Sequence, residues 1–279
     1  MPIAFLMNMA LMASSSLLAG RYFASEGPRY RLLALVTLAY AQIVFIQLFW
    51  GVLGKLYLSN IALSVLIILF ICYFLSRQGY PSSVKMSLMP DNLISGELLS
   101  NRVAILCLSI LLGFGLVKLS INLVNSPFGW DSLNYHFTFP VEWIKQANLK
   151  NPITINDDLA PSYYPINGSL IYLWLILPLK NVFLADLGQI PFFIISFLAL
   201  YGICRRIGIV REYSFYAAGL FTITPNYLKQ MEIAYVDVMV CAWFLMSLYF
   251  ILSLYYQGKA RHVVLSAIGL GMLIEIGRA

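Results

Sequence analysis

Charged residues are scarce in this sequence. Only 11% of its 279 residues are Asp, Glu, Lys or Arg, whereas 61% are hydrophobic. Soluble domains devote roughly a quarter of their residues to charge, so this chain has too little charge to cover a water-soluble globule. The composition therefore predicts an integral membrane protein whose main solvent is lipid.

Cysteine and histidine are scarce as well. The cysteines have no CxxC spacing and no histidine at metal-ligand spacing beside them, which argues against a cysteine-histidine metal site. We expect them to act as small core hydrophobes; they are Cys72, Cys107, Cys204 and Cys241. We expect His262, which follows Arg261 in a basic loop, to be solvated.

A basic segment is missing before the first apolar run, residues 3–19. This run therefore makes a poor signal peptide and is expected to be the first retained span. The net charge of +6 does not indicate nucleic-acid binding, because the basic residues stand in short loops between apolar runs. Such placement sets the orientation of a membrane protein.

Long apolar runs are what the sequence does have. A helix needs about 20 apolar residues to cross a bilayer, and we expect an all-α polytopic bundle of about eight spanning helices. The candidate spans are 3–19, 32–50, 57–75, 103–124, 187–204, 213–228, 238–256 and 262–276. We divide the chain into N-terminal helices (1–102) and a core (103–279). The end at Ala279, directly after a helix, suggests the N-terminal portion of a longer protein.

A ninth apolar run, residues 166–179, is too short to be assigned by length, and the loop charges decide its placement. If it does not cross, eleven basic residues share one side and five share the other, in agreement with the positive-inside rule. If it crosses, every later loop breaks this pattern. We therefore expect residues 125–185 to form one long outer loop. The eleven are Arg21, Arg29, Arg31, Arg77, Lys85, Arg102, Arg205, Arg206, Arg211, Lys259 and Arg261.

The outer loop contains most of the candidate functional residues. It opens with SPFGWDSLNYHFTFP (126–140), and the segment 135–147 is typical of a short amphipathic helix at the headgroup level, with Tyr135 and Trp143 at the interface. Asp131 is either a partly desolvated general base or a simple helix N-cap. If Asp131 precedes a helix, Tyr135 and His136 lie about one turn later and come near it.

Three further acids complete the candidate set. Asp157 and Asp158 form an adjacent pair that either binds a divalent cation such as Mg²⁺ or Mn²⁺, with water or phosphate completing the shell, or lies in a solvated turn. Asp237, in the stretch AYVDVMV, either faces an outward cavity or simply starts a helix, where the helix dipole favours it.

Four segments together resemble the GT-C superfamily of membrane glycosyltransferases, which includes the protein O-mannosyltransferases and aminoarabinose transferases. They are GWDSLNYHFTFPVEWIKQANL (129–149), SYYPINGSLIYLW (162–174), ALYGICRRIG (199–208) and PNYLKQMEIAYVDVMVCAWFLMSLYF (225–250). They occur in the order of the family and span about 120 residues.

The resemblance implies a function on the outer face of a bacterial inner membrane, facing the periplasm, in synthesis of the cell envelope. A sugar would pass from a polyprenyl-phosphate donor to a hydroxyl of a glycan, lipid or protein, with inversion and with Asp131 as base. Asp237 matches a later aspartate of the family. Tyr164 stands where relatives often have a lysine, so Lys145, Lys150 or an ion held by Asp157 and Asp158 would meet the phosphate.

Two other interpretations are open. A transporter or flippase-like lipid carrier would use its polar intramembrane residues to line a path. A non-catalytic, truncated remnant would fit the abrupt C-terminus and would be inactive alone.

Overall fold

The computed structural model describes residues 2–77, 101–125, 127–152, 154 and 158–276, and every regular element within these ranges is a helix. Six helical segments are long and apolar enough to cross a membrane. The prediction of an all-helical membrane protein is therefore confirmed at this level. The six are α1 (Pro2–Tyr22), α2 (Pro28–Val52), α3 (Leu58–Arg77), α5 (Arg102–Val124), η3 with α8 (Phe183–Gln189 and Ile190–Arg206) and α11 (Asp237–Gln257).

Two of the expected spans are not among these six helices. The run 213–228 divides into α9 (Arg211–Thr222, 12 residues) and α10 (Pro225–Lys229), and the run 262–276 corresponds to α12 (Ala260–Ile274, 15 residues). Pro225 explains the division, because proline cannot donate to a continuing helix and restricts the residue before it. At 1.5 Å per residue α9 is only about 18 Å long. The eight-span count stays a prediction.

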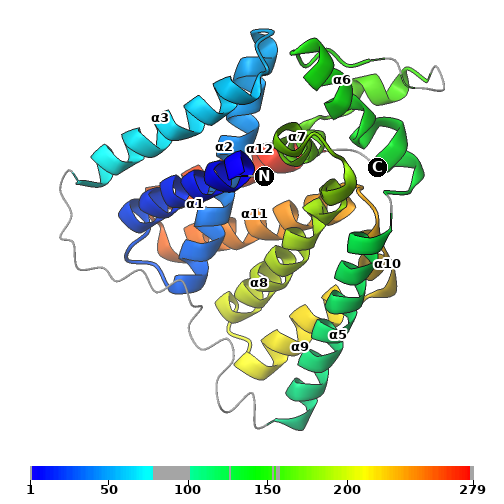
Figure 1. Cartoon of the computed structure of the whole chain (residues 1–279). Helices are drawn as coiled ribbons and strands as arrows, with labels where there is room; N and C mark the ends of the chain where they lie inside the picture. Colours follow the sequence, from blue (N-terminus) through cyan, green and yellow to red (C-terminus); the bar gives the residue numbers. More distant parts are fainter. Residues whose placement is uncertain (1, 78–100, 126, 153, 155–157, 277–279) are drawn as a thin grey trace.

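The helices form a bundle with two flanks and a shared centre (Figure 1). Helices α1, α2 and α3 pack together on one flank, while α5 lies beside α9 on the other. Between them, α11 packs against both α8 and α12, and α2 reaches α7 (Asn167–Leu179). One buried core runs through these elements, from Met7 on α1 to Ile276 after α12.

Connecting segments gather at two ends of this bundle. The first, which we call the Arg-rich end, holds residues 23–27, 205–211 and 257–261, joined by contacts of Glu26 with Lys259 and Arg261. The second, the Asp131 end, holds residues 53–57, 127–152, 158–166 and 230–237. There the Leu56 amide donates to the Ala147 carbonyl at 2.9 Å.

Helix α7, formed by the short apolar run, belongs to the Asp131 end. At its start the Asn167 amide donates to the Glu275 carbonyl at 2.9 Å. After it, Gln189 Nε2 at the end of η3 donates to the Gln230 carbonyl at 3.0 Å and to the Ile233 carbonyl at 2.5 Å. The residues before and after α7 therefore both lie near the Asp131 end. Which side of a membrane this end faces stays a prediction.

The amphipathic segment expected at 135–147 differs in detail from the structure. A π-helical turn, η1 (Ser132–His136), precedes α6 (Thr138–Gln146). Trp143 is fully buried and its Nε1 donates to the Lys150 carbonyl at 3.1 Å. This ring therefore anchors α6 to the protein, and the placement of Trp143 at the headgroup level stays a prediction.

The expectation that His262 is solvated is wrong. Its side chain is fully buried, its Nδ1 lies 2.5 Å from the Tyr30 hydroxyl, and its Nε2 lies 3.1 Å from Gln257 Oε1. The sequence placed His262 in a basic loop, but α12 already begins at Ala260 and turns this side chain toward α2. Of the cysteines, expected in the core, Cys72, Cys107 and Cys204 are buried and Cys241 is half-buried.

Replacing Gly168 by alanine is expected to destabilise the fold by about 1–3 kcal/mol, the usual cost of overpacking. An added Cβ would stand only 2.7 Å from the backbone oxygen of Ile276 and would also collide with Val236. Gly113→Ala is the matched control, since nothing lies within 4 Å of its Cβ position and alanine favours a helix. In thermal unfolding in detergent, the midpoint should be lower for Gly168→Ala but not for Gly113→Ala. Equal midpoints for the two variants would contradict this packing.

Candidate functional site

The candidate site lies at the Asp131 end, where η1, the start of α7 and the start of α11 meet. Asp131 directly precedes η1, in the N-cap position, but its side chain makes no capping hydrogen bond. The carboxylate is half-buried. The N-cap interpretation of Asp131 thus describes its place in the chain but not what its carboxylate contacts.

Tyr135 is a polar neighbour of Asp131. Burial raises the pKa of the Tyr135 hydroxyl, and the charge of Asp131 and a hydrogen bond with its carboxylate raise that pKa further. Tyr135 therefore stays protonated at neutral pH and presents a donor to the Asp131 carboxylate. The Tyr164 ring packs edge-on against the Tyr135 ring, with centroids 5.6 Å apart.

Asp237 lies close to Asp131 although 105 positions separate them in the sequence. It is the first residue of α11, half-buried, and near enough to Asp131 for the two charges to repel. Its charge also acts on the Tyr172 hydroxyl. The structure therefore brings four predicted residues into one place: Asp131, Tyr135, Tyr164 and Asp237.

His136 supports this group from inside the protein. Its side chain is only 5% exposed, and its Nδ1 lies 3.1 Å from Ser169 Oγ. Burial lowers the pKa of His136 to about 3, so the ring is neutral at physiological pH. It packs against Tyr135 at 4.3 Å and Tyr172 at 5.9 Å between centroids. This buried position suits a side chain that holds Tyr135 in place better than one that contacts a substrate.

Lys145 and the acidic pair are placed differently. Lys145 Nζ forms a surface ion pair with Glu142 at 2.6 Å. Asp157 lies outside the described residues. Asp158 is exposed, and its Oδ1 accepts from the Ala160 amide at 2.9 Å, at the start of η2 (Ala160–Tyr163). Within the described ranges, which leave out Asp157, no three His, Cys, Asp or Glu residues gather to hold a metal. A divalent ion held by Asp157 and Asp158 stays a prediction.

Several residues of this site carry no signal in the sequence. The Tyr172 hydroxyl donates to the Tyr235 carbonyl. Gly129 has a φ of 102°, and an added Cβ would stand 2.6 Å from Ile233 and 3.2 Å from a ring carbon of Tyr235. Glycine permits both this backbone conformation and the close approach. The similar motifs GWD (129–131) and YVD (235–237) could suggest that the two segments meet, but only the fold shows that they do.

An apolar cavity of about 460 Å³ lies between α5 and α8. Its wall includes Met231, whose carbonyl accepts a hydrogen bond of 2.7 Å from Asn122 Nδ2 on α5. The chain runs from Met231 through Ile233 to Asp237 at the site. The cavity is lined mainly by Leu108, Leu111, Leu112, Leu116, Leu119, Phe193, Ile194, Phe197, Leu198 and Phe215.

Comparison with known proteins yields no match to a family model, a curated protein or a solved structure. Membership of the GT-C superfamily therefore stays a prediction from the four sequence segments.

Proposed function

We propose that this protein is a membrane glycosyltransferase that moves a sugar from a polyprenyl-phosphate donor to an acceptor hydroxyl. The observation that carries this proposal is the convergence of Asp131 and Asp237, from distant parts of the chain, beside two tyrosines. Carboxylates near a membrane boundary are costly unless solvated or paired. A cluster of two therefore supports a functional site more than a structural one.

In the proposed reaction Asp131 accepts the proton of the acceptor hydroxyl. The oxygen of that hydroxyl forms a new bond to the anomeric carbon of the donor sugar, and the bond from this carbon to the lipid phosphate breaks. The configuration at the carbon inverts, and the phosphate leaves with the bonding electron pair. A positioned base of this kind typically contributes about 10²–10⁴-fold to the rate.

The neighbours of Asp131 have separate roles in this scheme. The protonated Tyr135 hydroxyl orients the Asp131 carboxylate, and the neutral His136 ring holds Tyr135 in place. Tyr164 and Asp237 contact sugar hydroxyl groups. The hydroxyl of Tyr164 can also donate to the phosphate, a role supported by its place against Tyr135.

The apolar cavity between α5 and α8 suits the lipid part of such a donor. Its lining is almost wholly aliphatic and aromatic, as a polyprenyl chain requires. The segment 231–237 links it to Asp237, so a chain in the cavity would have its phosphate directed toward the site. We further propose eight spans, with the Asp131 end facing the outside of a bacterial inner membrane.

The test is a transfer assay with the full protein in lipid vesicles. A polyprenyl-phosphate hexose is supplied with candidate glycan, lipid and peptide acceptors, and the release of polyprenyl phosphate is followed. Acceptor-dependent release with inversion at the anomeric carbon is expected. Transport of the intact donor across the vesicle membrane, without release, would instead identify a lipid carrier.

A further inference from the structure

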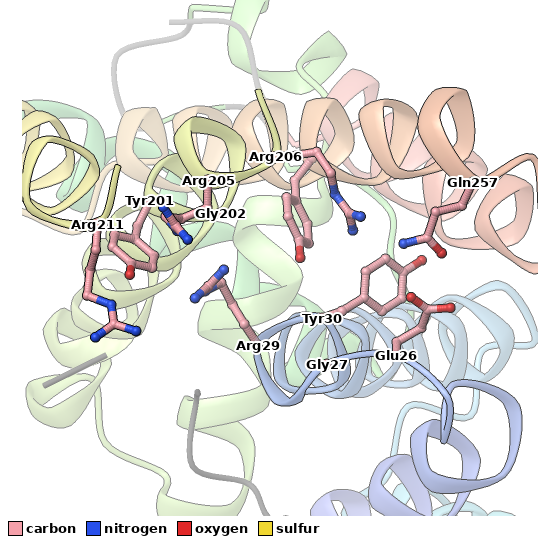
Figure 2. A pocket seen from close by; sticks show the side chains of 11 residues that line it. Glu26, Gly27, Arg29, Tyr30, Tyr201, Gly202, Arg205, Arg206, Arg211 and Gln257 are labelled. Carbon is pink, nitrogen blue, oxygen red and sulfur yellow. The ribbon is translucent and has the colours of Figure 1, made fainter. Parts of the chain in front are cut away.

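A polar cavity lies at the Arg-rich end, at the other end of the bundle from Asp131. It has a volume of about 330 Å³ and lies where α2, α8, α9 and α11 meet, within the range of small-ligand pockets. Four arginines line it, from α2, α8 and α9: Arg29, Arg205, Arg206 and Arg211. Figure 2 shows Arg29 on α2 extending toward Tyr201 and Arg205 on α8.

Two of the guanidinium groups are positioned by aromatic rings. Arg29 stacks over Tyr201 at 4.4 Å from the ring centroid, and Arg206 lies over Tyr249 at 5.6 Å. Arg206 Nη2 also donates to Ser253 Oγ at 2.9 Å. A guanidinium has five N–H donors in a planar fork, so these contacts leave donors for a ligand. The Nε of Arg29 is buried and has no hydrogen-bond partner among the described residues.

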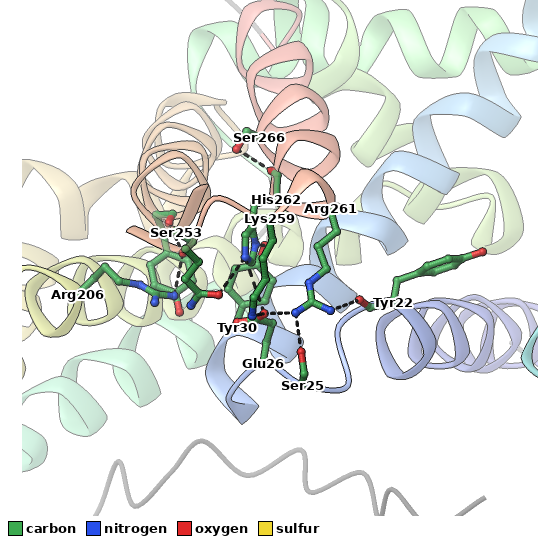
Figure 3. Close-up of polar contacts among 12 residues, drawn as sticks. Tyr22, Ser25, Glu26, Tyr30, Arg206, Ser253, Lys259, Arg261, His262 and Ser266 are labelled. Carbon is green, nitrogen blue, oxygen red and sulfur yellow. Dashed lines mark hydrogen bonds and ion pairs between the residues drawn. The ribbon is translucent and has the colours of Figure 1, made fainter. Parts of the chain in front are cut away.

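The negative charge within the cavity does not balance these arginines. Among the described residues that line it, Glu26 is the one acid. Its carboxylate is already paired with Lys259 Nζ at 2.9 Å and Arg261 Nη2 at 2.5 Å (Figure 3). Four further cations in one small cavity repel one another, and an anion would relieve this repulsion.

Helix ends add to the positive potential. Gly27, which lines the cavity, is the N-cap of α2, and Arg211 opens α9; neither helix start has a side-chain cap. Amide groups at the start of a helix favour anions, phosphate in particular. The positive-inside rule accounts for arginines in these loops, but it does not require that they converge in one cavity.

We propose that this cavity binds the phosphate of an anionic phosphate ester, with Arg29 and Arg206 as principal ligands. Arginine suits this role because its fork matches phosphate oxygens in pairs. Three apolar side chains at the junction of α8 and α9 are exposed beside the cavity: Ile207, Val210 and Tyr213. A lipid-facing rim of this kind makes a phospholipid headgroup the expected source. The inference does not depend on the proposed transfer reaction.

The test compares lipid retention by the purified full chain in native mass spectrometry. Phosphatidylglycerol and phosphatidylcholine with matched acyl chains are supplied. The unmodified protein is expected to retain phosphatidylglycerol at least about 10-fold better. The double variant Arg29→Gln with Arg206→Gln should lose this preference, because it removes two charge-assisted contacts. Arg29→Lys with Arg206→Lys should keep only part of it.

Arg77→Gln with Arg102→Gln is the matched control, since it removes the same charge from exposed positions on α3 and α5. Equal retention by the pocket variant and this control would overturn the proposal. So would equal retention of both lipids by the unmodified protein. A salt titration of the unmodified protein is independent of any folding defect: about 0.5 M salt should release phosphatidylglycerol but not phosphatidylcholine, and release of neither would also overturn it.

Inorganic phosphate and glycerol 3-phosphate distinguish the source of the phosphate. Displacement of phosphatidylglycerol by either of them at about millimolar concentration would identify a soluble phosphate ester as the ligand of the same site. Their failure to compete would identify the lipid headgroup. Both results support the phosphate chemistry, whereas competition that persists unchanged in the Arg29→Gln and Arg206→Gln variant would overturn it.

Discussion

The variant Asp131→Asn is expected to lose sugar transfer by about a thousand-fold, the effect of removing a positioned general base. Asparagine has the shape of aspartate but does not accept the proton of the acceptor hydroxyl. The loss should appear in kcat, because the proton is transferred in the transition state and not when the substrate binds. The assay is acceptor-dependent release of polyprenyl phosphate by the full protein in vesicles.

Glu275→Gln is the control for Asp131→Asn. It removes one negative charge from an exposed acid near the same end of the bundle, outside the candidate set, and it should retain nearly all transfer. Thermal unfolding of both variants checks that the fold is intact. Full transfer by Asp131→Asn would eliminate Asp131 as the base.

The second large effect is expected at the Arg-rich end, where Glu26→Gln should destabilise the protein by about 2 kcal/mol. The Glu26 side chain is only 4% exposed and pairs with Lys259 and Arg261. Removing one partner of a fully buried pair costs about 3–5 kcal/mol. The expected value is smaller because the Lys259 and Arg261 side chains are 44% and 29% exposed and keep part of their hydration.

This stabilisation should depend on pH. Burial by itself would raise the pKa of Glu26, but the hydrogen bond and charge of Lys259, the hydrogen bond from Arg261 and the charge of His262 outweigh it, so the pKa is lowered from 4.5. A lowered folded-state pKa means that the ionised carboxylate stabilises the fold above about pH 4.5, and that this contribution is lost as pH falls through the folded-state value. The difference between the unmodified protein and Glu26→Gln should therefore be constant near neutrality and shrink in acid.

Glu142→Gln is the matched control for Glu26→Gln. Glu142 forms a surface pair with Lys145, whose side chain is 64% exposed, and such pairs contribute about 0–1 kcal/mol. Unfolding midpoints in detergent should fall by several degrees for Glu26→Gln and hardly at all for Glu142→Gln. Equal midpoints at neutral pH would show that the Glu26 cluster adds no stability.

Most helices could be predicted from the sequence because lipid demands long apolar runs and internally bonded backbone. The run 32–50 lies within α2, and Pro28 after Gly27 explains where this helix begins. Helix ends set by local geometry were harder to predict. The π-turn at Ser132–His136 lies in the expected outer loop, where hydropathy gives no helix period, and the break before Pro225 lies inside the apolar run 213–228 that hydropathy alone reads as continuous.

The candidate site was predictable only in part. The chemistry of Asp131 and Asp237 pointed to them individually, and the structure places them together. The contacts that hold the site join distant positions, as in the hydrogen bonds from Asn167 to Glu275 and from Tyr172 to Tyr235. Neither pair has a periodicity or spacing that sequence reasoning can use. The burial of His262 and the convergence of the arginines depend in the same way on how α2, α8 and α12 pack.

Labelling of single cysteines tests most directly whether the Asp131 end and the Arg-rich end face opposite sides of a membrane. Tyr163 and Asn181 flank α7, and Val210 follows α8; all three are exposed. Each is replaced by cysteine in a protein whose four native cysteines are changed to serine, and intact cells are treated with an impermeant thiol reagent.

Cysteines at 163 and 181 should be labelled from outside the cell, and the cysteine at 210 only after permeabilisation. Labelling of 163 and 181 from opposite sides would show that α7 crosses the membrane. Labelling of 181 and 210 from the same side would show that the loop charges do not predict the topology. It would also contradict an outward-facing Asp131 site.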